Sequence, residues 1–167
     1  MQDKLREVVR ELLADGAVEY CIGYRESSQP PRVAPHFVAS ESEADRLVWG
    51  PLCGQNLGKY VLGANDIEGK VGIVLKGCDT RAIVELIKQH QIERNKVVTI
   101  GMPCQGQVDL RKLERFLGVS LELVTGIEDA GDEFLVTIGE ETRKVAKEDI
   151  LLDKCFRCKH PLSLIHI

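Results

Sequence analysis

The chain has 167 residues, of which 44% are hydrophobic and 29% are charged, and its formal net charge is -4. These values suit one globular domain and exclude a disordered chain, and no apolar run is long enough for a membrane-spanning helix. The Lys and Arg residues are scattered along the sequence, which disfavours nucleic acid as a partner, and the charged first residues are unlike a secretory signal, so we expect a cytoplasmic protein.

The first 40 residues predict a helix followed by short strands. Apolar residues recur at three- and four-residue spacing over residues 2–14, which indicates a helix with one face against a core. Strands are predicted over residues 17–24 and 36–39. Ser40 and Glu43 have the spacing of a capping box, which predicts the start of a second helix.

The middle of the chain, residues 41–126, predicts alternating strands and helices. Two nearly continuous apolar runs rich in β-branched residues, 70–75 and 96–100, are typical of strands covered on both faces. Each precedes an amphipathic stretch, 79–90 or 107–117, that predicts a helix. Strands and helices that alternate in this way form parallel sheets with right-handed crossovers.

The last part of the chain predicts a β-hairpin and a tail with paired cysteines. Residues 133–138 and 143–146 form the hairpin, and residues 119–124 form a strand before it. The predicted fold class is therefore α/β, with a mainly parallel sheet, flanking helices, a small C-terminal β-hairpin and a cysteine-pair segment. The chain is predicted to be a single α/β domain in three parts: an N-terminal helix and strands (1–40), a strand and helix core (41–126), and the hairpin with its tail (127–167).

Three cysteines fall in loops of the strand and helix core. Cys78 and Cys104 follow the two buried strands, and Cys53 precedes a helix predicted over residues 56–62. These cysteines are 25 and 26 residues apart, close to the length of one strand–helix unit. Because loops at the carboxyl ends of parallel strands line one crevice, we expect the three thiols to converge on one ligand. The helix N-termini beside Cys78 and Cys104 favour the thiolate form that binds metal.

A further pair, Cys155 and Cys158, has the two-residue gap that lets both sulfurs reach one metal or cluster. Six cysteines in a cytoplasmic chain indicate metal or redox chemistry rather than disulfides. Cys21, in a predicted strand, is interpreted as a small buried hydrophobic residue. The candidate metal ligands are the other five thiols, Cys53, Cys78, Cys104, Cys155 and Cys158.

These interpretations have alternatives. Cys53 can be a buried filler of the core, and Cys78 and Cys104 can be thiols that bind no metal. Cys155 and Cys158 can belong to a structural zinc site, because zinc also takes four thiolates.

The histidines carry less information. No predicted helix holds two of them at metal-binding spacing. His160 follows the cysteine pair and is a candidate fourth ligand, although a solvated role is the simpler interpretation. His36, His90 and His166 are expected at the surface.

The helix start after the first buried strand offers a second kind of site. Lys76, Gly77, Thr80 and Arg81 are predicted to hold a phosphate-bearing cofactor there, because unpaired N–H groups at a helix N-terminus attract anions. The alternative is that Asp79 and Thr80 simply cap the helix. The sequence has no Walker motif and no G-x-G-x-x-G, so neither familiar nucleotide loop is present.

Four segments resemble one known family. Gly101-Met102-Pro103-Cys104-Gln105 resembles the glycine-x-proline-cysteine-glutamine turn of coenzyme F420 hydrogenase/dehydrogenase beta subunits. Cys155-Phe156-Arg157-Cys158 is similar to the later paired cysteines of that family. The segments 76–81 and 51–53 are similar to a ferredoxin-like branch associated with formate dehydrogenase and heterodisulfide reductase systems. The resemblance covers residues 49–161.

The resemblance implies an oxidoreductase subunit that binds FAD and a 4Fe-4S cluster. Such a subunit passes electrons between a flavin, a deazaflavin or ferredoxin and the other subunits of a redox complex. The cluster ligands implied by the resemblance are Cys78, Cys104, Cys155 and Cys158, with Cys53 as a substitute for one of them. Family members usually continue beyond the cysteine pair, so we expect this chain to be truncated at its C-terminus.

Two other classes of function stay open from the sequence. One is a zinc-stabilised structural or interaction module with no redox activity, which metal analysis distinguishes. The other is a metal-free anion- or dinucleotide-binding domain, which keeps its cofactor when every cysteine except Cys78 is replaced.

Overall fold

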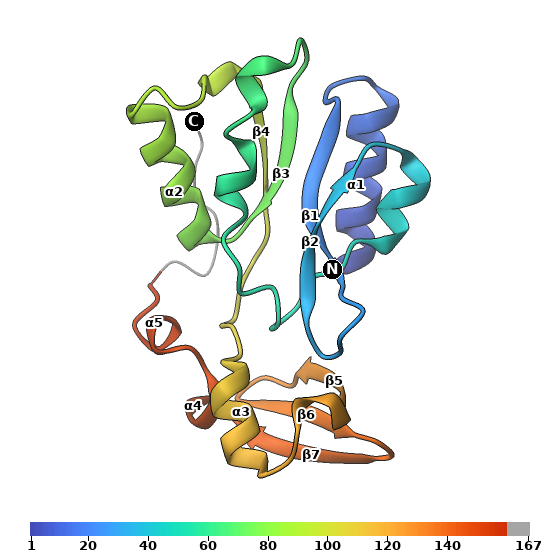
Figure 1. Cartoon of the computed structure of the whole chain (residues 1–167), viewed down its shortest axis with the longest axis vertical. Helices are drawn as coiled ribbons and strands as arrows, with labels where there is room; N and C mark the ends of the chain where they lie inside the picture. The colour runs from blue at the N-terminus through green and yellow to red at the C-terminus, as the bar shows by residue number, and fades with distance from the viewer. Residues whose placement is uncertain (160–167) are drawn as a thin grey trace.

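Two β-sheets with their own helices make up the structure, a computed structural model that describes residues 1–159 (Figure 1). In the view of Figure 1 the larger sheet lies above the smaller one, and the chain descends to the smaller sheet after strand β4. Our expectations for His160, His166 and the C-terminal end concern residues outside the described ones.

The larger sheet has four strands in the order β2-β1-β3-β4. Strands β1, β3 and β4 run parallel, and β2 pairs antiparallel with β1 at the edge. The strands are β1 (Tyr20–Glu26), β2 (Val33–Val38), β3 (Val71–Leu75) and β4 (Val97–Gly101). The prediction of an α/β fold with a sheet of mostly parallel strands is confirmed, with shifted ends for the first two strands.

Helices cover both faces of this sheet, α1 (Gln2–Ala14) on one and α2 (Gly77–Lys88) on the other (Figure 1). Successive strand residues point to opposite faces, so Ile73 of β3 packs in the core on the α2 side and Val74 in the core on the α1 side. All of β3 is buried, as predicted for a strand covered on both faces. Cys21 lies fully buried in the α1 core, which confirms its interpretation as a hydrophobic residue.

The smaller sheet is antiparallel and has the order β5-β6-β7. Its elements are β5 (Val124–Asp129), β6 (Glu133–Ile138), β7 (Glu141–Ala146) and the helices α3 (Leu110–Leu117) and α4 (Lys147–Ile150), followed by the short α5 (Asp153–Phe156). Phe134 of β6, Leu113 of α3 and Ile150 of α4 pack in one core. The predicted hairpin is confirmed as β6 and β7. Across residues 1–159 no helix is both long and apolar enough to cross a membrane.

The strand predicted over residues 119–124 is wrong. Helix α3 ends at Leu117, and Gly118 caps it with a φ of +67° that glycine readily adopts. A 3-10 turn over Leu121–Leu123 follows. The Ser120 hydroxyl caps this turn, and strand β5 begins only at Val124. Local side-chain capping therefore competes successfully with extended structure here.

The predicted helix starts also need correction. Helix α3 begins at Leu110 rather than at residue 107, because the Asp109 carboxylate accepts hydrogen bonds from two first-turn amides. The two helices predicted near residues 40 and 56 are 3-10 turns, Glu41–Arg46 and Leu57–Val61. Ser40 makes no side-chain capping bond.

His36 is not the surface residue that we predicted. It lies in β2 opposite Gly23 and is 8% exposed, while its neighbour Phe37 is exposed. The two-residue period of a strand places His36 on the covered side and Phe37 on the solvent side. His90, by contrast, is exposed as predicted.

Candidate functional site

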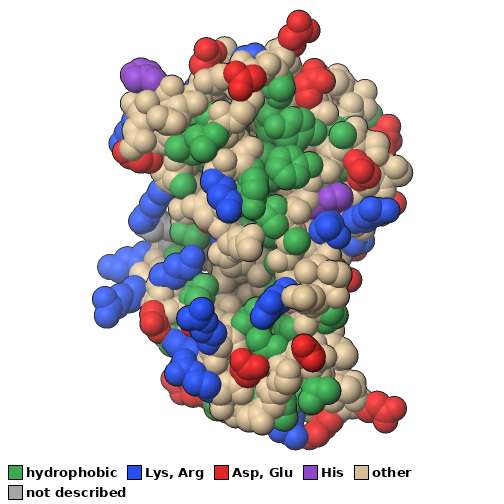
Figure 2. All heavy atoms as spheres, viewed as in Figure 1, with side chains coloured by type: hydrophobic (Ala, Val, Ile, Leu, Met, Phe, Trp, Pro, Cys, Tyr) green, Lys and Arg blue, Asp and Glu red, His purple; other side chains and the backbone are tan. Residues whose placement is uncertain are grey.

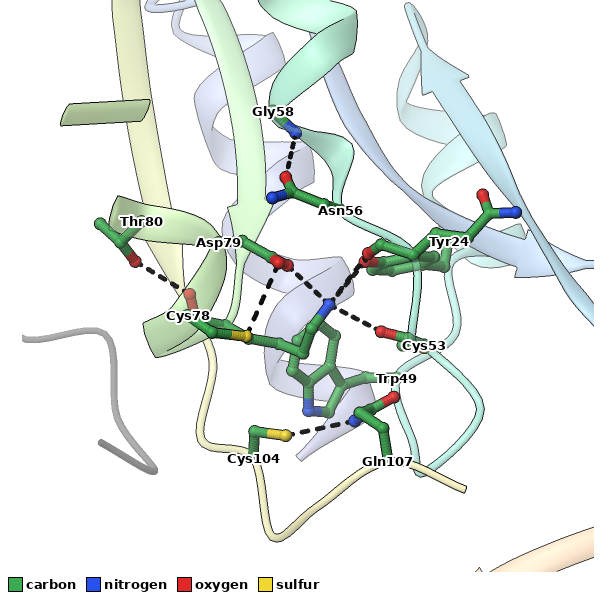
Figure 3. Close-up of polar contacts among 12 residues, drawn as sticks. Tyr24, Trp49, Cys53, Asn56, Gly58, Cys78, Asp79, Thr80, Cys104 and Gln107 are labelled. Carbon is green, nitrogen blue, oxygen red and sulfur yellow. Dashed lines mark hydrogen bonds and ion pairs between the residues drawn. The ribbon is translucent and has the colours of Figure 1, made fainter. Parts of the chain in front are cut away.

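The cysteine-bearing loops meet at the carboxyl ends of β3 and β4, close to the smaller sheet. Cys78 lies at the start of α2, directly after β3, and Cys104 lies in the loop after β4. Because β3 and β4 are parallel neighbours, their loops leave the sheet side by side. Figure 3 shows Cys78 and Cys104 on the left of the view and Cys53 on the right.

A buried lysine lies at the centre of this region. Lys76 is 1% exposed, and its ammonium nitrogen lies 2.6 Å from the Asp79 carboxylate. It also donates to the Tyr24 hydroxyl at 2.8 Å and to the main-chain carbonyls of Cys53 and Gln55 at 2.7 and 3.1 Å. Lys76 therefore ties the end of β3 to the loop that carries Cys53.

Aromatic rings complete the surroundings of this ammonium. The ring centroids of Tyr24 and Trp49 lie 5.1 and 6.0 Å from the Lys76 nitrogen, within the range of cation–π attraction (Figure 3). Burial raises the pKa of Tyr24 far above its ordinary value, and the negative charge of Asp79 raises it further. Tyr24 is consequently neutral, and its hydroxyl can donate to the Gln55 carbonyl while it accepts from Lys76.

The residues predicted to bind phosphate are mostly engaged within the protein. The Thr80 hydroxyl is buried and donates to the Lys76 carbonyl, four residues earlier, at 2.9 Å. The alternative that Asp79 and Thr80 cap the helix is wrong, because Lys76 is the N-cap residue of α2 and there is no side-chain capping bond. Lys76 and Gly77 are buried, and Arg81 is exposed. A phosphate-binding role for these four residues stays a prediction.

Gln107 connects two of the thiols. Its side-chain amide donates to the Cys104 sulfur at 3.2 Å and to the Gly50 carbonyl at 3.4 Å. Burial raises the pKa of Cys155, and a hydrogen bond from the main-chain amide of Gln107 opposes that rise. The side chain of Gln107 is 3% exposed, and its carbonyl oxygen has no hydrogen-bond partner within residues 1–159. Gln107 thus donates to two sulfurs, through its side-chain amide to Cys104 and through its main-chain amide to Cys155.

Main-chain hydrogen bonds hold three cysteine-bearing segments together around residues 107–109. The Val108 amide donates to the Pro51 carbonyl at 2.8 Å, next to Cys53. The Asp109 amide donates to the Ile150 carbonyl at 2.7 Å, and the Leu152 amide donates to the Gln107 carbonyl at 2.9 Å. These bonds place the Cys104 loop between the segment before Cys53 and the segment before Cys155.

A charge on Cys104 affects the pKa values of two other thiols. Burial is the main cause of the raised pKa values of Cys78 and Cys155, and a negative charge on Cys104 contributes to each. Lys154 lies near both of these thiols and opposes the rise. Cys158 is exposed and lies within electrostatic range of Cys155. Cys104 is thus within electrostatic range of Cys78 and Cys155, and Cys158 follows on the chain.

Cys53 has a different environment from the other candidate ligands. It is 1% exposed, its sulfur lies 3.8 Å from the Val48 carbonyl, and burial raises its pKa to about 12. A thiol with this pKa is protonated near neutral pH, whereas metal binding requires the thiolate. These features favour the alternative that Cys53 fills the core.

The predicted convergence of Cys53, Cys78 and Cys104 on one point is not seen in this arrangement. No three Cys, His, Asp or Glu side chains among residues 1–159 lie close enough to hold a metal ion in the present arrangement. Cys78 and Cys158 are exposed, and Cys104 and Cys155 are half-buried, so all four sulfurs are accessible to an incoming iron–sulfur cluster. The donor set of four thiols, with the Gln107 amide beside Cys104, fits such a cluster chemically.

A pocket of about 680 Å³ adjoins the Cys104 loop. Its lining includes Trp49, Cys53, Cys104, Gln107 and residues 125–129 of β5. This volume is typical of a small-molecule or cofactor site. The sequence patterns gave no indication of Trp49 or Gln107, because neither residue belongs to a recognisable ligand motif.

Comparisons with known proteins agree with this fold. A family model that describes the C terminus of the coenzyme F420 hydrogenase/dehydrogenase beta subunit matches residues 68–164. The chain is 25% identical over 158 residues to F420-dependent formate dehydrogenase 1 subunit beta of Methanococcus maripaludis, covering 88% of this chain and 41% of that protein. It is 27% identical over 132 residues to F420-dependent formate dehydrogenase subunit beta of Methanocaldococcus jannaschii, covering 73% of this chain and 33% of that protein.

A solved structure gives the same picture of the fold. A chain of the F420-reducing NiFe hydrogenase complex from Methanosarcina barkeri superposes with a TM-score of 0.71 at 19% sequence identity, covering 96% of this chain and 60% of that one. The chain spans less than half the length of either of the two formate dehydrogenase subunits. Since the family model covers more than half of the sequence, the chain belongs to the coenzyme F420 hydrogenase/dehydrogenase beta subunit family, as its motifs indicated.

Proposed function

We propose that this chain is part of an electron-transfer subunit that holds a 4Fe-4S cluster. The observation that carries the proposal is that Cys78 and Cys104 lie in the loops that follow the parallel neighbours β3 and β4, with Cys104 within electrostatic range of Cys78 and Cys155. Thiols that are at least partly exposed and come from separate loops of such a fold are suited to cluster binding, and the relatives are beta subunits of F420-dependent dehydrogenases.

In this proposal Cys78, Cys104, Cys155 and Cys158 are the ligands. Cys53 is the substitute considered from the sequence, and its burial makes it the weaker choice. A bound 4Fe-4S cluster supplies one-electron redox chemistry. The Gln107 amide stabilises negative charge on the Cys104 sulfur, and Lys154 does so for Cys78 and Cys155.

We further propose that the 680 Å³ pocket beside Cys104 holds FAD or another flavin. Trp49, which lines this pocket, offers an aromatic surface to a flavin ring. A flavin in this pocket lies next to Cys104, so electrons have a short path between the two cofactors.

The proposed partners are the other subunits of a redox complex and a flavin or deazaflavin carrier, because the similar proteins are named as beta subunits of F420-dependent enzymes. A cytoplasmic location is part of the proposal. The six cysteines are free thiols, the state that the reducing cytosol maintains.

Anaerobic purification of the full chain, followed by iron, sulfide and flavin analysis, tests the proposal. We expect a brown protein with about four iron and four sulfide per chain, the content of one 4Fe-4S cluster. Cys104→Ser should lose most of the iron and sulfide, whereas Cys21→Ala, which removes a buried core thiol, should retain both. A colourless protein with one zinc and no sulfide would instead support the structural zinc module.

A further inference from the structure

Basic side chains gather beside the cysteine pair, although the whole chain is acidic. Helix α3 and the segment 153–159 together carry six basic and two acidic residues, within a chain of net charge -4. We call the six basic residues the basic surface: Arg111, Lys112, Arg115, Lys154, Arg157 and Lys159. Figure 2 shows Lys and Arg side chains concentrated on the side of the molecule where these elements lie in Figure 1.

Contacts between the two segments make this one continuous surface. The Lys112 ammonium lies 2.5 Å from the Asp153 carboxylate and 2.9 Å from the Leu151 carbonyl, so it joins α3 to the start of α5. It also lies 5.5 Å from the ring centroid of Phe156. The charge of Arg157 helps Lys112 to lower the pKa of Asp153. One of the two acidic residues is therefore neutralised within the surface itself.

The basic surface adjoins the thiols that we propose as cluster ligands. Lys154 acts on the pKa values of both Cys78 and Cys155, which places its charge close to each sulfur. Cys78 and Cys158 are exposed, and Phe156 between the paired cysteines is 51% exposed. An apolar ring surrounded by positive charge, next to accessible thiols, is a suitable contact for another protein.

We propose that the basic surface docks a small acidic redox protein. The inference rests on the proposed function, because docking there brings the partner's redox centre close to the cluster site. One electron then leaves the reduced carrier, which is oxidised, and reduces the group held by the thiols, and no bond forms or breaks. Uncompensated positive charge attracts a negatively charged partner over a distance and orients it before contact.

Charge and shape favour a protein partner over a lipid surface. Helix α5 has only four residues and presents Phe156 as its exposed apolar side chain, whereas membrane-surface helices bury a broad apolar face. An electron carrier bound at this surface would also lie close to the thiols, which a lipid surface does not require.

Binding of the full chain to an acidic bacterial two-cluster ferredoxin, measured by calorimetry at low and at physiological ionic strength, tests the inference. The variant R111E/R115E/K159E reverses three charges of the basic surface and keeps every thiol. Of the three changed residues, only Lys159 is next to a cysteine in the sequence. The control variant K4E/R25E/K144E makes the same change in net charge at exposed positions on α1, β1 and β7. Circular dichroism establishes that each variant is folded.

We expect the wild type and the control to bind ferredoxin, and the basic-surface variant to bind at least about tenfold more weakly. Affinity of the wild type should fall as the Debye length shrinks from about 30 Å at 0.01 M salt to about 8 Å at 0.15 M. Equal losses in the two variants would overturn the inference, since the effect would then come from net charge alone.

Two further outcomes separate this inference from the proposed function. Binding of vesicles rich in phosphatidylserine, with no binding of ferredoxin, would assign the surface to a membrane and overturn the docking of a redox protein. Calorimetry does not require an iron–sulfur cluster, so ferredoxin binding by a chain without iron supports docking while the cluster proposal fails. A chain that holds the cluster but shows no salt-dependent binding overturns the docking proposal alone.

Discussion

The ammonium of Lys76 and the carboxylate of Asp79 form an ion pair of 2.6 Å in which the two side chains are 1% and 3% exposed. The remaining donors of Lys76 are directed at Tyr24 and at main-chain carbonyls of the loop that carries Cys53. Charges taken out of water are costly unless they are paired, and these two side chains pair with each other. Lys76 is also hydrogen-bonded, whereas the buried Asp79 Oδ2 has no hydrogen-bond partner within residues 1–159 and relies on the ion pair. The pair therefore fixes the relation between the α2 N-terminus and that loop.

Replacement of Lys76 by methionine should destabilise the fold strongly, because Asp79 would be left as an uncompensated buried charge. We expect a loss of about 3–5 kcal/mol in the free energy of unfolding, measured by urea denaturation. Removal of both charges, in Lys76→Met with Asp79→Leu, should be less harmful than Lys76→Met alone. Lys88→Met, at the exposed end of the same helix, should change stability by less than about 0.5 kcal/mol. If Lys76→Met were as stable as Lys88→Met, the buried ion pair would contribute little to stability.

Gly106 should not tolerate a side chain. Its φ is +114°, and a Cβ there would lie 2.6 Å from a methyl carbon of Leu151. We expect Gly106→Ala to lower the free energy of unfolding by about 1–3 kcal/mol through backbone strain and crowding, measured by thermal or urea denaturation. Gly50 lines the same pocket, has no such φ, and a Cβ added to it would meet nothing within 4 Å, so Gly50→Ala should be near neutral. Equal stability of the two variants would contradict the assigned crowding.

Gln107→Met should lower the reduction potential of the proposed cluster. The variant keeps the length of the side chain but removes the amide that donates to the Cys104 sulfur. Hydrogen bonds to ligand sulfur stabilise the reduced, more negative state and so raise the potential. A redox titration followed by electron paramagnetic resonance measures the shift. Gln105→Met, at an exposed position two residues away, serves as the control, and a potential unchanged in both variants would argue against Cys104 as a ligand.

His36 should make stability depend on pH in the mildly acidic range. Burial lowers its pKa below the ordinary value, Glu43 opposes this lowering in part, and the charges of Arg25 and Arg46 add to it. The unfolded chain therefore takes up the proton more readily than the folded one, so the contribution of His36 is complete above about pH 6.5 and is lost as the pH falls below that value.

Thermal melts between neutral and mildly acidic pH measure this effect. His36→Gln should lose less stability than the wild type as the pH falls, because it has no group to protonate at this position. His90→Gln, at an exposed residue, should follow the wild type. Parallel curves for wild type and His36→Gln would rule out a contribution from burial of the imidazole.

Much of the larger sheet could be predicted from local patterns. The runs that became β3 and β4 are nearly continuous in apolar residues, a pattern typical of strands covered on both faces. This expectation holds for β3, which is buried throughout, but is wrong for β4, which lies at the edge of the sheet with only Val97 buried. The hairpin of β6 and β7 was likewise evident from alternation around Gly139, whose φ is +60°. The failure at residues 119–124 came from a capped turn, where one serine side chain outweighs β propensity.

Of the candidate site, the sequence indicated the cysteines as possible ligands but not the side chains that surround them. Lys76 was assigned a ligand-binding role because it precedes a helix, and its burial depends on carbonyls supplied by residues 53 and 55, which no local pattern reveals. Gln107 was expected to begin a helix, whereas its position is set by contacts with Gly50, Cys104 and Leu152. Long-range contacts of this kind arise from the tertiary fold and leave no periodic trace in the sequence.

The main-chain hydrogen bonds of residues 107–109 allow sequences with this fold to diverge widely. These bonds to Pro51, Ile150 and Leu152 use peptide N–H and C=O groups, which every residue except proline possesses in full. Side-chain substitutions at these places leave the bonds available, so the three thiol-bearing stretches can stay in register while most of the surrounding residues are exchanged. A proline introduced at Val108 would remove the amide that donates to the Pro51 carbonyl. It would thereby detach the segment before Cys53 from the Cys104 loop, which other substitutions at this position would not do.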